Sequence, residues 1–204
     1  MMLSITKLLI KIPVILIAVT IHEYAHGRMA ALLGDPTPRQ QGRLTLNPIP
    51  HLDPLGALLL LVAGFGWAKP VEVNPYYFRG NRQRGMMLVA LAGPLSNLLV
   101  ALLGGILYNL FDKYTYLAAF SLALTSINVY LALFNLIPVP PLDGSKIVFG
   151  ILPRHLHGFL YQLEAYGPLL LMLLIVTNIT DFLITPARGI ILTILRFGQF
   201  IIGS

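Results

Sequence analysis

The chain has 204 residues, of which 56% are hydrophobic and 11% are charged, whereas a soluble globular domain carries about 25% charged residues. This composition excludes an ordinary soluble domain and predicts a membrane protein built as one helical bundle. The absence of cysteine excludes disulfides and thiolate metal sites, and the net charge of +6 indicates a membrane face rather than nucleic acid, because no basic run is interleaved with aromatic residues.

The first predicted element is an apolar helix over residues 13–33. Proline is tolerated in the first turn of a helix, and Gly34, Asp35 and Pro36 form a strong stop signal. At about 1.5 Å per residue, this helix reaches about 30 Å, one hydrocarbon thickness. It has no small-residue cleavage site, so we expect a membrane span and not a signal peptide.

Residues 34–85 are more polar and richer in proline. The stretches GRLTLNP and KPVEVNP alternate in the way that short strands do, which predicts a small membrane-associated β element. Between them, residues 55–65 are apolar but too few for a helix that crosses the bilayer. We expect a re-entrant or interfacial segment there.

Two long apolar helices follow, over residues 86–111 and 116–137. Asp112 and Lys113 mark a tight connection between them. A further span is expected over residues 167–180, extended back through Leu163.

The last apolar segment, residues 186–202, either spans the membrane or lies in its interface. As a helix it would carry one polar stripe, formed by Arg188, Arg196 and Gln199. The predicted fold is an all-α polytopic membrane protein with about four to six transmembrane helices. We expect one domain over residues 1–204, with a catalytic core over about 13–150 and C-terminal helices over about 151–204.

Residues 22–26 read HEYAH, which fits the pattern H-E-x-x-H. On a helix, His22 and His26 lie about 40° apart around the axis, so both imidazoles can reach one zinc ion. Glu23 points about 100° away and is suited to act as a general base on a zinc-activated water. Ionisable side chains in an apolar helix are functional by default, because each is costly to insert. This favours a metal site over a polar patch satisfied by neighbouring helices.

A catalytic zinc takes three protein ligands and keeps one position for water or substrate. Asp143 follows an apolar span and three prolines, where non-helical chain could fold back into the bundle. His51 is a second candidate, with a loop or second-shell role as its alternative. The remaining candidates for the third ligand are His155, His157, Glu164 and Asp181.

With HEYAH in the first span and NLIPVPPLDG after the third, the sequence resembles the site-2 protease family of intramembrane zinc metallopeptidases. The resemblance implies one Zn²⁺ ion held by His22, His26 and Asp143, with Glu23 as the catalytic base. It implies regulated intramembrane proteolysis, the hydrolysis of peptide bonds in or next to transmembrane segments of membrane proteins. We expect a minimal form, without the inserted peptide-binding domain or the appended nucleotide-sensing domain of some relatives.

The stretch GPLSN, residues 93–97, also resembles a family element. The same resemblance implies that Asn97 and Asn135 face the active site, where an amide could bind substrate backbone or a developing oxyanion. The alternative for Asn97 is hydrogen bonding between helices.

His26 and Asp143 can share one ion only if their helices end at the same membrane face, which requires that residues 55–65 do not cross. That face would then carry nine of the 14 lysines and arginines. The positive-inside rule places this face in the cytoplasm, so we expect an integral protein of a prokaryotic cell membrane with its active site near the cytoplasmic face. The nine residues are Arg28, Arg39, Arg43, Lys69, Arg79, Arg82, Arg84, Lys146 and Arg154.

The alternative function is a non-catalytic membrane zinc-binding or transport protein. Transport predicts polar residues strung through several spans, and the two longest apolar runs carry no charge. Another class of membrane zinc peptidase would use Glu164 as its third ligand. A serine intramembrane protease is disfavoured, since G-x-S-x-G is absent. The expected partners are transmembrane protein substrates and the lipid bilayer, with no nucleic acid; the oligomeric state stays open.

Overall fold

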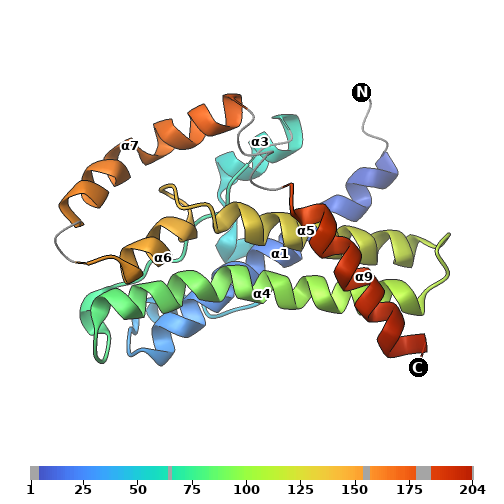
Figure 1. Cartoon of the computed structure of the whole chain (residues 1–204), viewed down its shortest axis with the longest axis horizontal. Helices are drawn as coiled ribbons and strands as arrows, with labels where there is room; N and C mark the ends of the chain where they lie inside the picture. Colours follow the sequence, from blue (N-terminus) through green and yellow to red (C-terminus); the bar gives the residue numbers. More distant parts are fainter. Residues whose placement is uncertain (1–4, 64–65, 154–156, 178–184, 204) are drawn as a thin grey trace.

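The computed structural model describes residues 5–63, 66–153, 157–177 and 185–203. Its regular elements are α-helices and two short 3₁₀ helices (Figure 1). In chain order they are α1 (Ile5–Leu32), α2 (Thr37–Gln40), η1 (Ile49–His51), α3 (Pro54–Ala63), η2 (Pro75–Tyr77), α4 (Arg82–Leu110), α5 (Tyr116–Asn135), α6 (Asp143–Ile151), α7 (His157–Val176) and α9 (Ala187–Gly203).

Three mutually packed helices, α1, α4 and α5, form the body of the molecule (Figure 1). In the described part of the chain, three stretches are long and apolar enough to cross a membrane: Leu8–Leu32, Arg82–Leu110 and Tyr116–Asn135. The all-α polytopic prediction is therefore supported, although three described spans fall short of the four to six expected. The span expected to end at residue 180 is only partly covered: α7 contains a shorter apolar stretch, Glu164–Leu174, and residues 178–184 lie outside the described residues.

Small residues let the spans approach closely. A Cβ atom added to Gly104 of α4 would lie 2.7 Å from the Thr125 hydroxyl of α5, and that hydroxyl donates to the carbonyls of Ser121 and Ala101. Helix α9 crosses α4 at Gly105, where an added Cβ would lie 2.4 Å from Ile194. Interfaces of this kind suit helices in lipid, because contact between helices there comes from close packing rather than from the hydrophobic effect.

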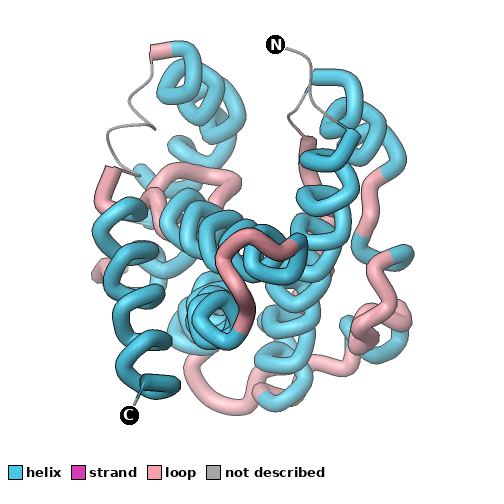
Figure 2. Tube along the Cα trace, turned by 90° about the vertical axis from the view of Figure 1, so that its right-hand side faces the viewer, coloured by secondary structure: helices cyan, strands magenta, loops and turns pink. Residues whose placement is uncertain are grey.

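The expected small β element is not present among the described residues, and Figure 2 shows no strand along the drawn trace. Residues 44–46 form bends, and within the described residues a single isolated antiparallel bridge joins Leu52 to Ala68. The side chain of Asn47 accepts from the amide of Ile49 and turns the chain. The alternating pattern was therefore a misleading signal for strands.

Helix α3 meets the topological condition on residues 55–65. Its 10 residues reach only about 15 Å, half of a hydrocarbon core. An added Cβ at Gly56 would lie 2.2 Å from the carbonyl oxygen of Trp67, so the chain turns back against α3 directly after it. Residues 64–65 lie outside the described residues.

Candidate metal centre

Helix α1 presents His22 and His26 one turn apart on the same side. Both residues are buried, with 6% of each exposed. Their rings meet edge to face with centroids 4.5 Å apart. This is the arrangement expected for residues at i and i+4 of one helix.

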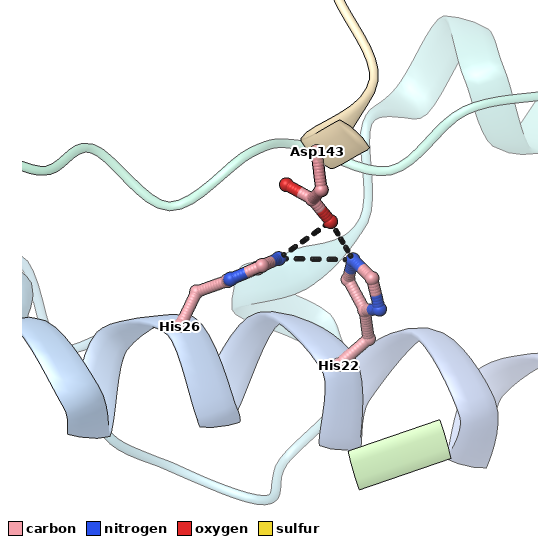
Figure 3. A group of neighbouring side chains, drawn as sticks. All are labelled: His22, His26 and Asp143. Atoms are coloured by element: carbon pink, nitrogen blue, oxygen red, sulfur yellow. Dashed lines mark hydrogen bonds and ion pairs between the residues drawn. The ribbon is translucent and has the colours of Figure 1, made fainter. Parts of the chain in front are cut away.

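Asp143 reaches the two histidines from a part of the chain that is distant in sequence (Figure 3). It is the first residue of α6, and its Oδ2 lies 3.1 Å from His22 Nε2 and 3.2 Å from His26 Nε2. The chain can pack this closely because Gly144 has no side chain. A Cβ at that position would lie 2.3 Å from the carbonyl oxygen of Leu136. Asp143 thus supplies the buried carboxylate, and the close backbone contact at the next position permits only glycine there.

The hydrogen bonds behind the imidazoles fix their tautomers. Nδ1 of His22 lies 2.7 Å from Asn97 Oδ1, and the Asn97 amide nitrogen donates to Asn128 Oδ1 at 2.8 Å. Oδ1 of Asn97 is thereby an acceptor, so His22 carries its proton on Nδ1. Nδ1 of His26 lies 2.7 Å from the Val89 carbonyl oxygen, which can only accept. In the neutral form, both Nε2 atoms therefore present lone pairs toward Asp143.

Three electron-pair donors consequently meet at one place. The two Nε2 atoms are 3.0 Å apart, and Asp143 Oδ2 is buried without a hydrogen-bond partner among the described residues. Ligand atoms around a tetrahedral ion with bonds of about 2.0–2.1 Å lie about 3.3 Å apart. Two imidazole nitrogens and a carboxylate oxygen form a zinc donor set, so these residues fit the ion and would repel one another without a cation.

The carboxyl group of Asp143 is in the state that a metal ligand needs. Burial by itself would raise the pKa of Asp143, but without a metal the hydrogen bonds and positive charge of the His22 and His26 imidazoles, once these are protonated at Nε2, outweigh burial and lower that pKa well below its usual range. The carboxylate is therefore ionised at neutral pH and can donate an electron pair.

Glu23 stands beside this group without belonging to it. It is buried, and its Oε2 accepts a hydrogen bond of 2.8 Å from the amide of Val71. His22, His26 and Asp143 are the described residues whose ligand atoms cluster closely enough for a metal. A carboxylate held next to a metal group, but outside it, is placed as a proton acceptor would be.

The other predicted site residues are not members of the metal group. Asn97 is fully buried and makes hydrogen bonds to His22, Ala18 and Asn128, so it both joins helices and contacts a ligand candidate, and its binding of substrate stays a prediction. Asn135 donates to the Leu131 carbonyl of its own helix. His51 is fully buried and pairs with the Thr45 carbonyl, away from the metal group.

The remaining candidates for the third ligand stay apart from this cluster. Glu164 is exposed on α7. His155 and Asp181 lie outside the described residues, as does the side chain of His157.

Two buried residues near the site had no part in the site predicted from the sequence. Asn128 extends the hydrogen-bond chain behind His22, and Arg43 is 4% exposed in the loop after α2. An asparagine in an apolar helix is a detectable signal. A buried arginine in a polar, proline-rich stretch is not, since its burial depends on contacts distant in sequence.

Comparison with known proteins agrees with this geometry. The profile described as "Peptidase family M50" matches residues 113–176, a stretch that contains Asp143. "Putative zinc metalloprotease YwhC" of Bacillus subtilis is 44% identical over 181 residues, covering 84% of this chain and 82% of the relative. "Putative zinc metalloprotease Rip2" of Mycolicibacterium smegmatis is 30% identical, covering 79% of this chain and 64% of the relative. No solved structure gives a significant match.

Proposed function

The chain belongs to peptidase family M50, the site-2 protease family of zinc metalloproteases, and from that premise we propose that it hydrolyses peptide bonds in or beside transmembrane segments of membrane-protein substrates. The observation that carries the proposal is the meeting of three buried electron-pair donors, two on the membrane helix α1 and one at the start of α6. The carboxylate of Glu23, the residue that follows His22, is close enough to interact electrostatically with His26 and is suited to general base catalysis.

In this proposal His22 Nε2, His26 Nε2 and Asp143 Oδ2 hold the ion. Bound zinc supplies a Lewis acid that activates water and polarises the scissile carbonyl. Asn97 and the Val89 carbonyl keep the imidazoles in the required tautomer. Burial of the group excludes bulk water and strengthens the electrostatic interactions within it.

Glu23 moves the proton. The amide of Val71 holds Oε2 of this carboxylate, and we assign Oε1 as the atom that takes a proton from the attacking water. The same oxygen then returns the proton to the leaving amine as the peptide bond breaks. Proton uptake and release at one carboxylate completes the hydrolysis without any further acid.

Substrate must be presented as extended chain, because a helix hides its amides in its own hydrogen bonds. Residues 69–74 run without helical structure past Glu23, and an unwound substrate could pair with residues 71–73 as an added strand. Residues 44–46, part of the other expected strand, form bends instead. An apolar pocket begins on the turn of α1 before His22, lined by Leu16, Ile17, Thr20, Ile21, Leu46 and Pro48.

We further infer that the reaction takes place near the cytoplasmic face of a prokaryotic cell membrane. Supporting this, Arg39, Arg79, Arg82 and Arg84 are exposed or half-buried near the end of the bundle where α1 finishes and α4 begins. Clusters of basic residues mark cytoplasmic ends of membrane spans.

Replacement of Glu23 by glutamine tests the function. The Glu23→Gln variant should retain zinc, because Glu23 lies outside the ligand group, while kcat for single-span model substrates falls by about 10²–10⁴-fold, the usual share of a general base. Purified protein in detergent gives both the zinc content, by elemental analysis, and the cleavage rate.

Glu164→Gln serves as the matched control. Glu164 is exposed on α7, so this variant should keep both zinc and activity. Full activity in Glu23→Gln would refute the assignment of the base. A wild-type protein that binds zinc and cleaves none of the substrates would favour the non-catalytic zinc-binding or transport function, and zinc loss in Glu164→Gln would favour the peptidase class with a glutamate ligand.

A further inference from the structure

Arg43 joins two backbone carbonyls with the two arms of its guanidinium group. Its Nη1 donates to the Pro50 carbonyl at 2.6 Å, and its Nη2 donates to the Lys69 carbonyl. Burying a charged group is costly unless its contacts are good, yet only 4% of Arg43 is exposed. The planar guanidinium fork can reach two carbonyls at once, which a lysine ammonium cannot do in the same geometry.

The two carbonyls belong to segments on either side of α3. The first segment, residues 43–52, is held in shape by His51, whose Nε2 pairs with the Thr45 carbonyl at 2.9 Å. The second segment, residues 66–71, pairs with the first through Lys69, whose amide donates to the His51 carbonyl at 2.9 Å. Both backbone groups of Lys69 are therefore fixed, one by Arg43 and one by His51.

Val71 lies two residues beyond this fixed point and donates its amide to Glu23 Oε2 at 2.8 Å. On the far side, the amide of Asn74 donates to Asp35 Oδ2 at 2.7 Å, and Asp35 is 1% exposed. The segment that carries the Val71 amide is thus anchored at both ends. One anchor is Arg43, whose charge is opposite to that of Glu23; the other is Asp35, whose charge has the same sign as that of Glu23.

The charges reinforce this placement. Burial lowers the pKa of Arg43, while the carboxylates of Glu23 and Glu72 act in the opposite direction. An arginine stays protonated in proteins. The guanidinium therefore remains a fixed positive charge close enough to interact with the proposed base.

We propose that Arg43 is a positioning residue of the peptidase: by clamping the Lys69 carbonyl it sets the Val71 amide against Glu23 and fixes the base for proton transfer. The inference rests on the proposed function of Glu23. Arg43 is not a catalytic residue, because it contacts neither the metal group nor the reacting atoms. Outer-shell partners of this kind typically change activity by about 10–100-fold when removed.

A double-mutant cycle tests whether Arg43 acts through the Val71 amide. Arg43→Ala removes the clamp, and Val71→Pro removes the N–H donor while keeping an extended backbone. Each variant should lower kcat by about 10–100-fold with zinc content unchanged. The double variant should be no slower than the slower single variant, because both changes break the same linkage.

Hydrogen exchange provides a readout that does not depend on activity. In Arg43→Ala, peptides from residues 66–74 should exchange about tenfold faster than in the wild type, with α4 and α5 unchanged. Arg39→Ala is the matched control, since Arg39 is an exposed arginine of the neighbouring α2 and should leave exchange and cleavage unaltered. Arg43→Lys, which keeps the charge and loses the fork, should show an intermediate effect and covers the case in which the alanine variant does not fold.

Multiplicative losses in the double variant, or unchanged exchange over residues 66–74 in Arg43→Ala, would overturn the positioning role. A wild-type protein without cleavage activity would instead defeat the proposed function. Slow exchange over residues 66–74 that depends on Arg43 would then still establish the clamp itself.

Discussion

Gly93 shows how one missing side chain makes room for the metal group. It lies in α4 opposite the histidines, and a Cβ there would sit 2.4 Å from His26 Nε2 and 2.6 Å from His22 Cε1. An added Cβ could be accommodated only if the imidazoles of His22 and His26 moved away from their present positions. GPLSN thus has a steric reason for its glycine as well as a hydrogen-bonding reason for Asn97.

We expect Gly93→Ala to weaken zinc binding by about tenfold or more, since overpacking of a tight site costs about 1–3 kcal/mol. Competition with a chelator during zinc titration measures the affinity. Gly189→Ala is the control, because an added Cβ there meets no atom within 4 Å. Equal zinc affinity in the wild type and Gly93→Ala would show that α4 gives way at this point.

Predictability at the residue scale follows from how local each signal is. His22, Glu23 and His26 share one helical turn, and Asp143 was identifiable because its motif resembles that of a known family. The structure brings the three ligand candidates together as that resemblance implied. The role of Arg43 depends on Pro50 and Lys69, on two segments whose path the sequence did not reveal.

The elements differ in the same way. The helices α4 and α5 begin and end within a few residues of the prediction, because apolar length alone defines them. The strand expected over KPVEVNP is absent where distant carboxylates take its backbone amides: Glu23 accepts from the amide of Val71, and Asp35 accepts from that of Asn74. The alternation of residues within one segment does not reveal a hydrogen-bond partner that lies in a distant segment.

One side chain of α4, that of Gln83, makes hydrogen bonds to the C-terminal end of α6. Gln83 Nε2 donates to the carbonyls of Phe149 and Leu152 at 2.8 Å each, and to that of Gly150 at 3.3 Å. Carbonyls at the end of a helix lack partners within the helix. Gln83 therefore fastens the element that begins with Asp143.

Gln83→Ala should destabilise the protein by about 1–3 kcal/mol, because it removes the side-chain hydrogen bonds that join α4 to the end of α6. Thermal unfolding in detergent measures the loss, and zinc content should fall with it as α6 loosens. Gln199→Ala on the exposed side of α9 is the control. An unfolding midpoint identical to that of the wild type would mean that water replaces Gln83 without cost.

At the scale of the whole molecule, the direction of insertion is open to a clean test. The chain has no cysteine, so single-cysteine variants carry one thiol each. Arg79 precedes α4 and Tyr114 follows it, and both are exposed, so they report opposite ends of one span. The excess of basic residues near Arg79 predicts that this end is cytoplasmic.

In intact cells, a membrane-impermeant maleimide should therefore label Tyr114→Cys, and it should label Arg79→Cys only after the membrane is opened. Each variant serves as the control for the other, because both thiols should react fully in detergent. The opposite labelling pattern would place the metal centre near the outer face and reject the cytoplasmic assignment.

The division of the metal centre between α1 and α6 also bears on biosynthesis. Chains are made and inserted from the N-terminus, so His22 and His26 enter the membrane long before Asp143 is translated. Helices α4 and α5 lie between the two halves of the ligand set. A nascent chain therefore has an incomplete ligand set until both of these spans have been made, so the order of synthesis itself makes completion of the metal centre a late event.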